Sequence, residues 1–177
     1  MTKRWMRALA ALATGAVALG LQAAAAQAPE LIFKKSTVWK FLTPDHKLAT
    51  YAIDEPLVDG VACHFTVPEK GGVSGMFGVA EETSDISLAC RQVGPIAFKG
   101  PFEQGDEMFE QRRSVFFKKM QIVRGCDATR NVLVYVVYSD KLIEGSPKNS
   151  TSTVPIMPWG TSEPPPRCSE FVKDRPS

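Results

Sequence analysis

The sequence predicts a mainly β protein, a single-domain antiparallel barrel or sandwich with one or two short helices. The first observation is the run 132–138, in which every residue is β-branched, aromatic or leucine and which is too short for a stable helix. This run is typical of a strand buried on both faces, and we expect it at the centre of a sheet. The second observation is the repeated alternation of short apolar segments with turn signals. A length of 177 residues suits one domain with its own core.

The remaining strands are predicted from alternating apolar residues and from the turn residues at their ends. They are expected at residues 30–41, 47–54, 61–67, 86–93, 114–124 and 154–159. The segment 114–124 should form a hairpin with the central run across a polar turn. The overlapping segment 107–119 is ambiguous, because its apolar residues fit a helix in part and a strand in part. The glycine-rich stretch 69–78 lacks the spacing of a dinucleotide-binding loop and is expected to be a surface loop. Its tip, Met76 and Phe77, could contact a partner.

The first 26 residues have the features of an export signal. Three basic residues precede the apolar stretch 8–21, and Ala24-Ala25-Ala26 supplies the small residues that a signal peptidase requires. We therefore expect cleavage near Ala26 and export to the periplasm, with the mature domain at 27–160. The apolar stretch is too short to span a bilayer and no later segment is long enough, so no membrane span is expected.

The charge of the chain excludes nucleic acid as an expected partner. Lysine and arginine number 21 against 19 acidic residues, and three of the cations belong to the export signal, so the mature chain is close to neutral. A neutral domain lacks the broad positive field that attracts nucleic acid. We expect an unknown protein or small-molecule partner instead, and no cofactor, because the chain contains no cofactor-binding motif.

Four cysteines, Cys63, Cys90, Cys126 and Cys168, are expected to form two disulfides in an oxidising compartment. Their spacings are long and include no Cys-x-x-Cys pair, so neither a zinc site nor a thioredoxin-like motif is predicted. Sequence reasoning leaves all three possible pairings open. Residues 161–177 are rich in proline and charge, which is typical of a disordered tail, but Cys168 should tie this tail to the domain.

No recognised catalytic motif occurs in the sequence. Two polar segments are the candidate sites for catalysis or ligand binding. His46 lies between Asp45 and Lys47 and is the better candidate for a neutral-pH base, because His64 stands on a strand beside Cys63. The second segment follows the central strand. The candidate ligand-binding residues are Asp45, His46, Lys47, Asp85, Ser139, Asp140, Lys141, Glu144, Ser146, Lys148 and Asn149. No His-x-x-x-His spacing supports a metal site, and no Gly-x-Ser-x-Gly or Ser-x-x-Lys pattern supports a serine nucleophile.

Several motifs in a fixed order resemble the CreA family of exported bacterial proteins. They are Thr43-Pro44-Asp45-His46-Lys47, Cys90-Arg91-Gln92-Val93-Gly94-Pro95-Ile96, Tyr138-Ser139-Asp140-Lys141 and Val154-Pro155-Ile156-Met157-Pro158-Trp159. The resemblance covers residues 33–159 and implies a periplasmic protein with no established biochemical activity. It also implies a disulfide pairing. Family members keep cysteines at Cys63 and Cys90, whereas Cys126 and Cys168 look like additions that pair with each other.

We therefore expect a non-enzymatic binding or envelope-associated protein. One alternative is a periplasmic hydrolase that uses His46 with a nearby carboxylate, Asp45 or Asp85. Another is a protein-interaction module that uses Phe77 and Trp159. A pocket that unites His46, Asp85 and residues 144–149 would favour the hydrolase, and an exposed aromatic patch would favour the interaction module.

Overall fold

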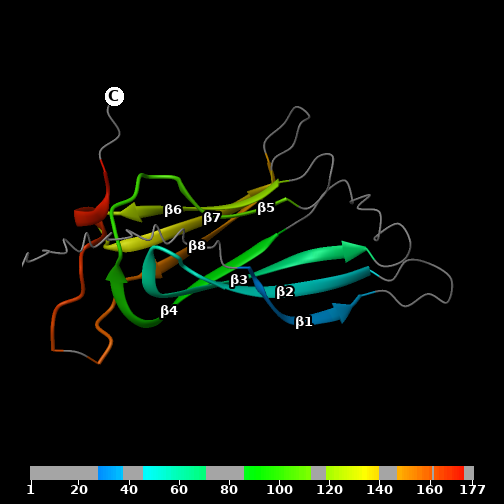
Figure 1. The fold of residues 1–177 in the computed structure, drawn as a ribbon, viewed down its shortest axis with the longest axis horizontal. Coiled ribbons are helices and arrows are strands. Elements are labelled where there is room, and N and C mark those ends of the chain that lie inside the picture. The colour runs from blue at the N-terminus through cyan, green and yellow to red at the C-terminus, as the bar shows by residue number, and fades with distance from the viewer. Residues whose placement is uncertain are drawn as a thin grey trace, which may run out of the picture.

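The computed structural model describes residues 28–37, 46–70, 86–112, 119–139, 147–160 and 162–173. These residues form two four-stranded antiparallel sheets, which face each other as the two layers of a sandwich (Figure 1). The predicted mainly β class is therefore confirmed, and of its two forms the structure takes the sandwich. The export signal and the tip of the glycine-rich stretch lie outside the described residues.

The first sheet has the strand order β1-β2-β3-β4. Its strands are β1 (Glu30–Ser36), β2 (His46–Asp54), β3 (Val58–Lys70) and β4 (Ser87–Phe98). The expected strand 86–93 is too short, because β4 continues through Gly94 and Pro95 to Phe98. The register between β3 and β4 shifts between Asp59 and Val61, and this bulge lets the proline remain in the strand without a ladder hydrogen bond.

The second sheet has the order β5-β6-β7-β8. Its strands are β5 (Asp106–Arg112), β6 (Lys119–Asp127), β7 (Val132–Ser139) and β8 (Asn149–Pro155). The predicted hairpin is confirmed as β6 and β7, which pair antiparallel along their whole length. The predicted start of its first strand at residue 114 lies outside the described residues.

Two strands of the second sheet differ from the predictions. The segment at β5 was ambiguous because a bulge between Glu107 and Phe109 turns both Met108 and Phe109 towards the core, which breaks the two-residue alternation. The last strand begins and ends earlier than the predicted 154–159. Residues 149–153, expected in a polar loop, belong to β8 because their polar side chains mostly occupy the exposed face of the strand.

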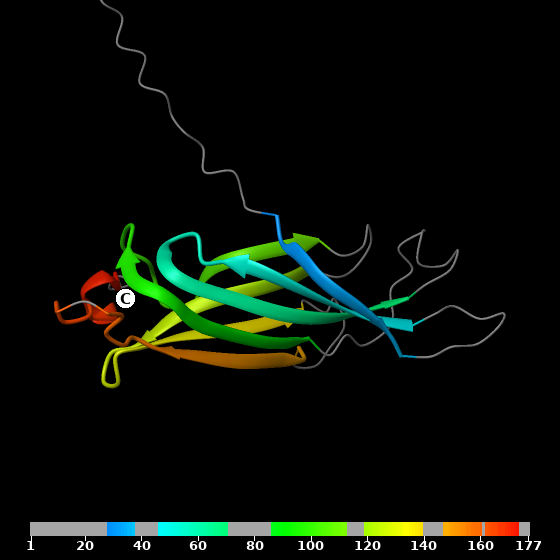
Figure 2. The same cartoon turned by 90° about the horizontal axis from the view of Figure 1, so that it is seen from below.

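The two sheets meet along one side of the sandwich, where β4 lies next to β8 (Figure 2). The backbone N–H of Cys90 donates a hydrogen bond of 2.8 Å to the Ser152 hydroxyl across this seam. The two strands do not form a ladder, so the sheets stay separate. On the opposite side, β1 and β5 are the edge strands.

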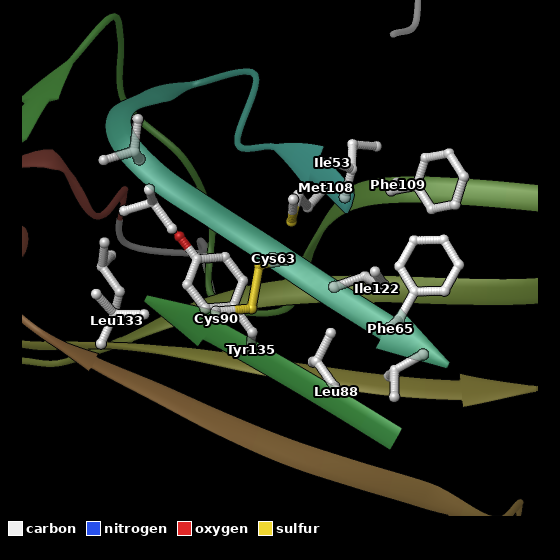
Figure 3. Close-up of a cluster of buried hydrophobic side chains, with 14 of the residues drawn as sticks. Ile53, Cys63, Phe65, Leu88, Cys90, Met108, Phe109, Ile122, Leu133 and Tyr135 are labelled. Atoms are coloured by element: carbon white, nitrogen blue, oxygen red, sulfur yellow. A yellow bond between two sulfur atoms is a disulfide. The ribbon is translucent and has the colours of Figure 1, made fainter. Parts of the chain in front are cut away.

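The core lies between the sheets, and the expectation that the central run is buried on both faces is wrong. In β7 the side chains of Leu133, Tyr135 and Val137 are fully buried, whereas the alternate residues are half-buried on the outer face. The inward side chains pack against β3 and β4, around the buried disulfide Cys63–Cys90 (Figure 3). Apolar β-branched residues on the outer face gave β7 the appearance of a fully buried strand.

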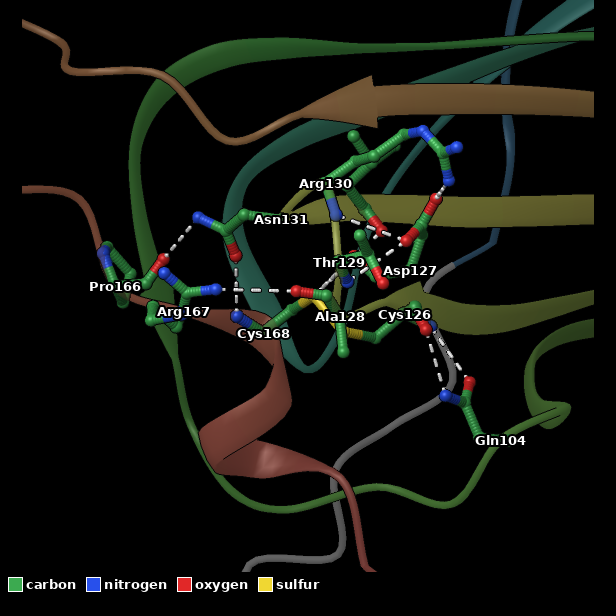
Figure 4. Close-up of a disulfide and its surroundings, with 11 residues drawn as sticks. Gln104, Cys126, Asp127, Ala128, Thr129, Arg130, Asn131, Pro166, Arg167 and Cys168 are labelled. Carbon is green, nitrogen blue, oxygen red and sulfur yellow. Dashed lines mark hydrogen bonds and ion pairs between the residues drawn. A yellow bond between two sulfur atoms is a disulfide. The ribbon is translucent and has the colours of Figure 1, made fainter.

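The second disulfide, Cys126–Cys168, ties the C-terminal segment to β6, so both pairings implied by the family resemblance are present. Cys168 begins η1 (Cys168–Phe171), a four-residue 3₁₀ helix that is the only helix among the described residues. Figure 4 shows this disulfide with the turn residues that surround it. The chain-entropy estimate gives each disulfide about 3–4 kcal/mol of stabilisation, because each closes a long loop.

Candidate functional site

One end of the sandwich collects the strand ends that flank residues 38–45, 71–85, 113–118 and 140–146; we call it the loop end. The register pairs His46 with Lys70 in the first sheet and Arg112 with Lys119 in the second. Tyr138 pairs with Asn149, and the seam between β4 and β8 aligns the two sheets so that these strand ends coincide. The candidate residues predicted from the sequence are far apart in the chain. They nevertheless lie in, or next to, segments that begin and end at the loop end.

The structure describes the side chains of four candidate residues. Lys47 is half-buried in β2, and Ser139 is buried as the last residue of β7. Lys148 and Asn149 are exposed, and the Asn149 Nδ2 group donates a hydrogen bond of 3.2 Å to the Pro147 carbonyl. Asp45, Asp85, Asp140, Lys141, Glu144, Ser146 and the His46 side chain lie outside what the structure describes.

Both carboxylates proposed to act with His46, Asp45 and Asp85, lie outside the described residues. His46 begins β2, and β4 begins at Ser87, with the whole of β3 between these two strands. The described residues give the hydrolase alternative no geometric support.

A polar cluster at the loop end was missed by sequence reasoning. Glu69 on β3 accepts a hydrogen bond of 2.7 Å from Lys34 Nζ on β1 and one of 2.8 Å from the Tyr51 hydroxyl on β2. The hydrogen bond that Lys34 donates to Glu69 raises the pKa of Lys34 above its ordinary value. Both carboxylate oxygens of Glu69 are engaged, so the cluster joins three strands and holds its charges in place. The sequence offered no signal, because 35 residues separate Lys34 from Glu69.

A second unpredicted polar group lies in the core. Arg124 on β6 forms an ion pair with Glu55, which follows β2, and the guanidinium carbon lies 5.9 Å from the centre of the Phe102 ring. The hydroxyl of Tyr135 is buried nearby and has no hydrogen-bond partner among the described residues. Burial, with a contribution from the Glu55 charge, raises the pKa of Tyr135 above its ordinary range. The Glu55–Arg124 ion pair links the two sheets. Solvent does not reach these side chains, so they offer no surface to a ligand.

An exposed apolar surface lies just after β8; we call Met157 and Trp159 the Trp159 surface. The Met157 side chain is 58% exposed and that of Trp159 is 46% exposed. Gln92 on β4 fixes this segment: its Nε2 group donates to the Met157 carbonyl at 2.9 Å, and its Oε1 accepts from the Met157 N–H at 2.9 Å. The Gln92 side chain thus clamps the Met157 backbone beside β4, two residues before Trp159. Sequence reasoning placed both residues in an edge strand and named Trp159, with Phe77, as a possible interaction surface; the structure describes Trp159 as exposed, while Phe77 lies outside the described residues.

Two further findings concern metal ions and membranes. Within the described ranges, no group of three histidine, cysteine, aspartate or glutamate side chains is placed to hold a metal ion. No helix in this part of the chain is long and apolar enough to cross a membrane.

These features define a disulfide-linked, two-layer β-sandwich with a polar loop end and an exposed apolar surface. The chain belongs to the CreA family: the family model described as CreA protein matches residues 32–159. It is 47% identical over 134 residues to Protein CreA of Escherichia coli strain K12, which covers 73% of this chain and 85% of that protein. Protein CreA of Escherichia coli O157:H7 matches to the same extent. No solved structure matches the chain. The family match ends at Trp159, so Cys168 and η1 lie beyond it.

Proposed function

We propose that this CreA family member is an exported, non-enzymatic binding protein of the periplasm that contacts a protein partner through the Trp159 surface. The observation that carries the proposal is the exposure of Met157 and Trp159 in a segment that Gln92 binds through the Met157 backbone. The export signal in the sequence and the pairing of all four cysteines support the periplasmic location, since disulfides persist in oxidising compartments.

The chemistry of the Trp159 surface fits a protein interface. Methionine and tryptophan are enriched at such interfaces, and tryptophan often supplies a large share of the binding energy. A side chain that is already fixed loses little conformational freedom on binding, so more of its contact energy appears as affinity. The same holds for a backbone segment, and the two Gln92 hydrogen bonds hold the Met157 backbone against β4.

The experiment is affinity capture from a periplasmic extract with the tagged mature protein and three matched variants. We expect a partner to be recovered by the wild type and by the double variant Asp45→Ala/His46→Ala, and to be lost with Met157→Ser/Trp159→Ser. Leu48→Ser is the control, because Leu48 is also an exposed apolar residue but lies on β2. Equal recovery by the Met157/Trp159 variant would refute the proposal. Loss confined to the Asp45/His46 variant would instead assign binding to the loop end.

A further inference from the structure

The edge strand β1 has more exposed large apolar residues than any other described strand. All seven of its residues are exposed, and Leu31, Ile32 and Phe33 in sequence are 47%, 47% and 56% exposed. Figure 1 shows β1 as the outermost strand of its sheet, and among the described residues it pairs only with β2. An edge with three consecutive large apolar residues is a template for pairing with another strand.

The register with β2 shows which way each β1 side chain faces. Leu31 and Lys34 pair with Tyr51 and Ala49, so they lie on the face that is turned towards the second sheet. Glu30, Phe33 and Lys35 pair with Ala52, Thr50 and Leu48, so they lie on the outer face. A bulge between Leu31 and Phe33 leaves Ile32 as the extra residue.

This pattern is self-complementary in one antiparallel register. When Glu30 lies opposite Lys35 of a second copy, Leu31 lies opposite Lys34 and Ile32 opposite Phe33. In this register Glu30 meets Lys35 on the outer face and Leu31 meets Lys34 on the inner face, and the two-fold axis repeats both pairs on the other side of the bulge. No ion pair to Glu30 or Lys35 is found in the described part of the chain, so both charges can serve this contact.

The neighbouring registers are less favourable. A shift by one residue places Glu30, which faces outward, across from Ser36 or Lys34, which face inward. The register that aligns Lys34 with itself satisfies the faces but sets like charges directly opposite each other, which is destabilising. Charge complementarity therefore selects a second copy of this chain, in one register, as the occupant of the edge.

We propose that the mature protein forms a two-fold symmetric dimer in which β1 of each copy pairs antiparallel with β1 of the other. The first sheets of the two copies then form one continuous sheet. The apolar residues at 31–33 become covered at the centre of the contact, and two Glu30–Lys35 ion pairs flank them. The proposal does not depend on the Trp159 surface.

Sedimentation equilibrium of the mature, disulfide-intact protein tests the proposal through a charge swap. The wild type should sediment as a dimer. Glu30→Lys and Lys35→Glu should each weaken dimerisation by about tenfold or more, because each change sets like charges opposite at both symmetric positions. The double variant Glu30→Lys/Lys35→Glu restores opposite charges and should recover the wild-type dissociation constant. Lys173→Glu, an exposed charge far along the chain, is the control and should change nothing.

Three results would overturn the proposal. The first is a wild type that remains monomeric at all concentrations. The second is a double variant that dimerises as weakly as the single variants, with thermal melts that show all of them folded. The third is a Lys173→Glu variant that weakens dimerisation as much as the changes in β1, since that would indicate a general effect of net charge.

Discussion

Glu55 and Arg124 form an ion pair in which Arg124 Nη2 lies 2.9 Å from Glu55 Oε1, although their side chains are only 0% and 5% exposed. The pair joins the turn after β2 in the first sheet to β6 in the second. Glu55 Oε1 also accepts a hydrogen bond of 2.9 Å from the Leu57 N–H. A buried charge is tolerated only when it is paired and hydrogen-bonded, so each member of this pair depends on the other.

Arg124→Met should destabilise the protein by about 3–5 kcal/mol, because it leaves the Glu55 carboxylate buried without a counter-charge. The double variant Glu55→Gln/Arg124→Met should recover most of this loss, since glutamine is neutral and still offers an acceptor to the Leu57 N–H. Urea denaturation measures both free energies of unfolding. A double variant as unstable as Arg124→Met would show that the cost does not come from the unpaired charge.

Gly60 and Gly105 both have positive φ angles, 81° and 83°, but their surroundings differ. A Cβ atom at Gly60 would lie 2.3 Å from the Pro95 carbonyl oxygen, whereas none of the described atoms lies within 4 Å of one at Gly105. Gly105→Ala should cost only the backbone strain, about 1–2 kcal/mol. Gly60→Ala should cost clearly more, because the backbones of β3 and β4 must separate at the bulge. Equal losses in urea denaturation would contradict this close approach.

Asn131 holds the C-terminal segment through its side chain. It has a left-handed backbone with φ 53°, its Oδ1 accepts from the Cys168 N–H at 2.9 Å, and its Nδ2 donates to the Pro166 carbonyl at 3.0 Å (Figure 4). Asn131→Ala should destabilise by about 1–3 kcal/mol from the two lost hydrogen bonds. Asn131→Gly loses the same bonds without the backbone strain and should be about 1 kcal/mol more stable than the alanine variant. Thermal denaturation that fails to separate the two variants would exclude the backbone contribution.

Asp127 should titrate below its ordinary pKa of 3.8, chiefly because the Arg130 side chain donates a hydrogen bond of 2.8 Å to its carboxylate. Arg130→Met should therefore raise the Asp127 pKa towards 3.8, although the backbone N–H groups of Thr129 and Arg130 still lower it in part. Because folding lowers the Asp127 pKa, the ionised carboxylate contributes to the stability of the folded protein. This contribution is complete above the pKa of the unfolded state and is lost as the pH falls through the pKa of the folded state. Carbon NMR titration measures the pKa of the Asp127 carboxylate in the wild type and in the variant. An unchanged pKa in the variant would contradict the role assigned to Arg130.

The sequence predicted those parts of the fold that depend on local pattern. The hairpin of β6 and β7 was found because its apolar residues and its turn are contiguous, but the valines on the outer face of β7 suggested a second buried face. The strand β5 was not recognised, since its bulge puts Met108 and Phe109 on the same side. In both strands the pairing with the neighbouring strand was needed, besides the residue pattern, to tell which side chains face the core.

The polar sites could not be predicted because they join distant positions. Glu55 and Arg124 are 69 residues apart, and only the packing of the two sheets brings them together. The candidates around His46 and Lys148 were found one by one as polar loop residues, while their common position at the loop end required the strand registers. The position of the Met157 backbone likewise depends on the Gln92 clamp, which links residues 65 apart.

The most direct test of the proposed binding function is photo-crosslinking in living cells, with a benzoyl-phenylalanine residue placed at position 159. This residue keeps a large aromatic side chain at the centre of the Trp159 surface. The same residue at position 153, which is exposed on β8, serves as the control. We predict a discrete crosslinked adduct from position 159 and none from position 153. Absence of an adduct at 159, or the same adducts from both positions, would contradict binding through the Trp159 surface.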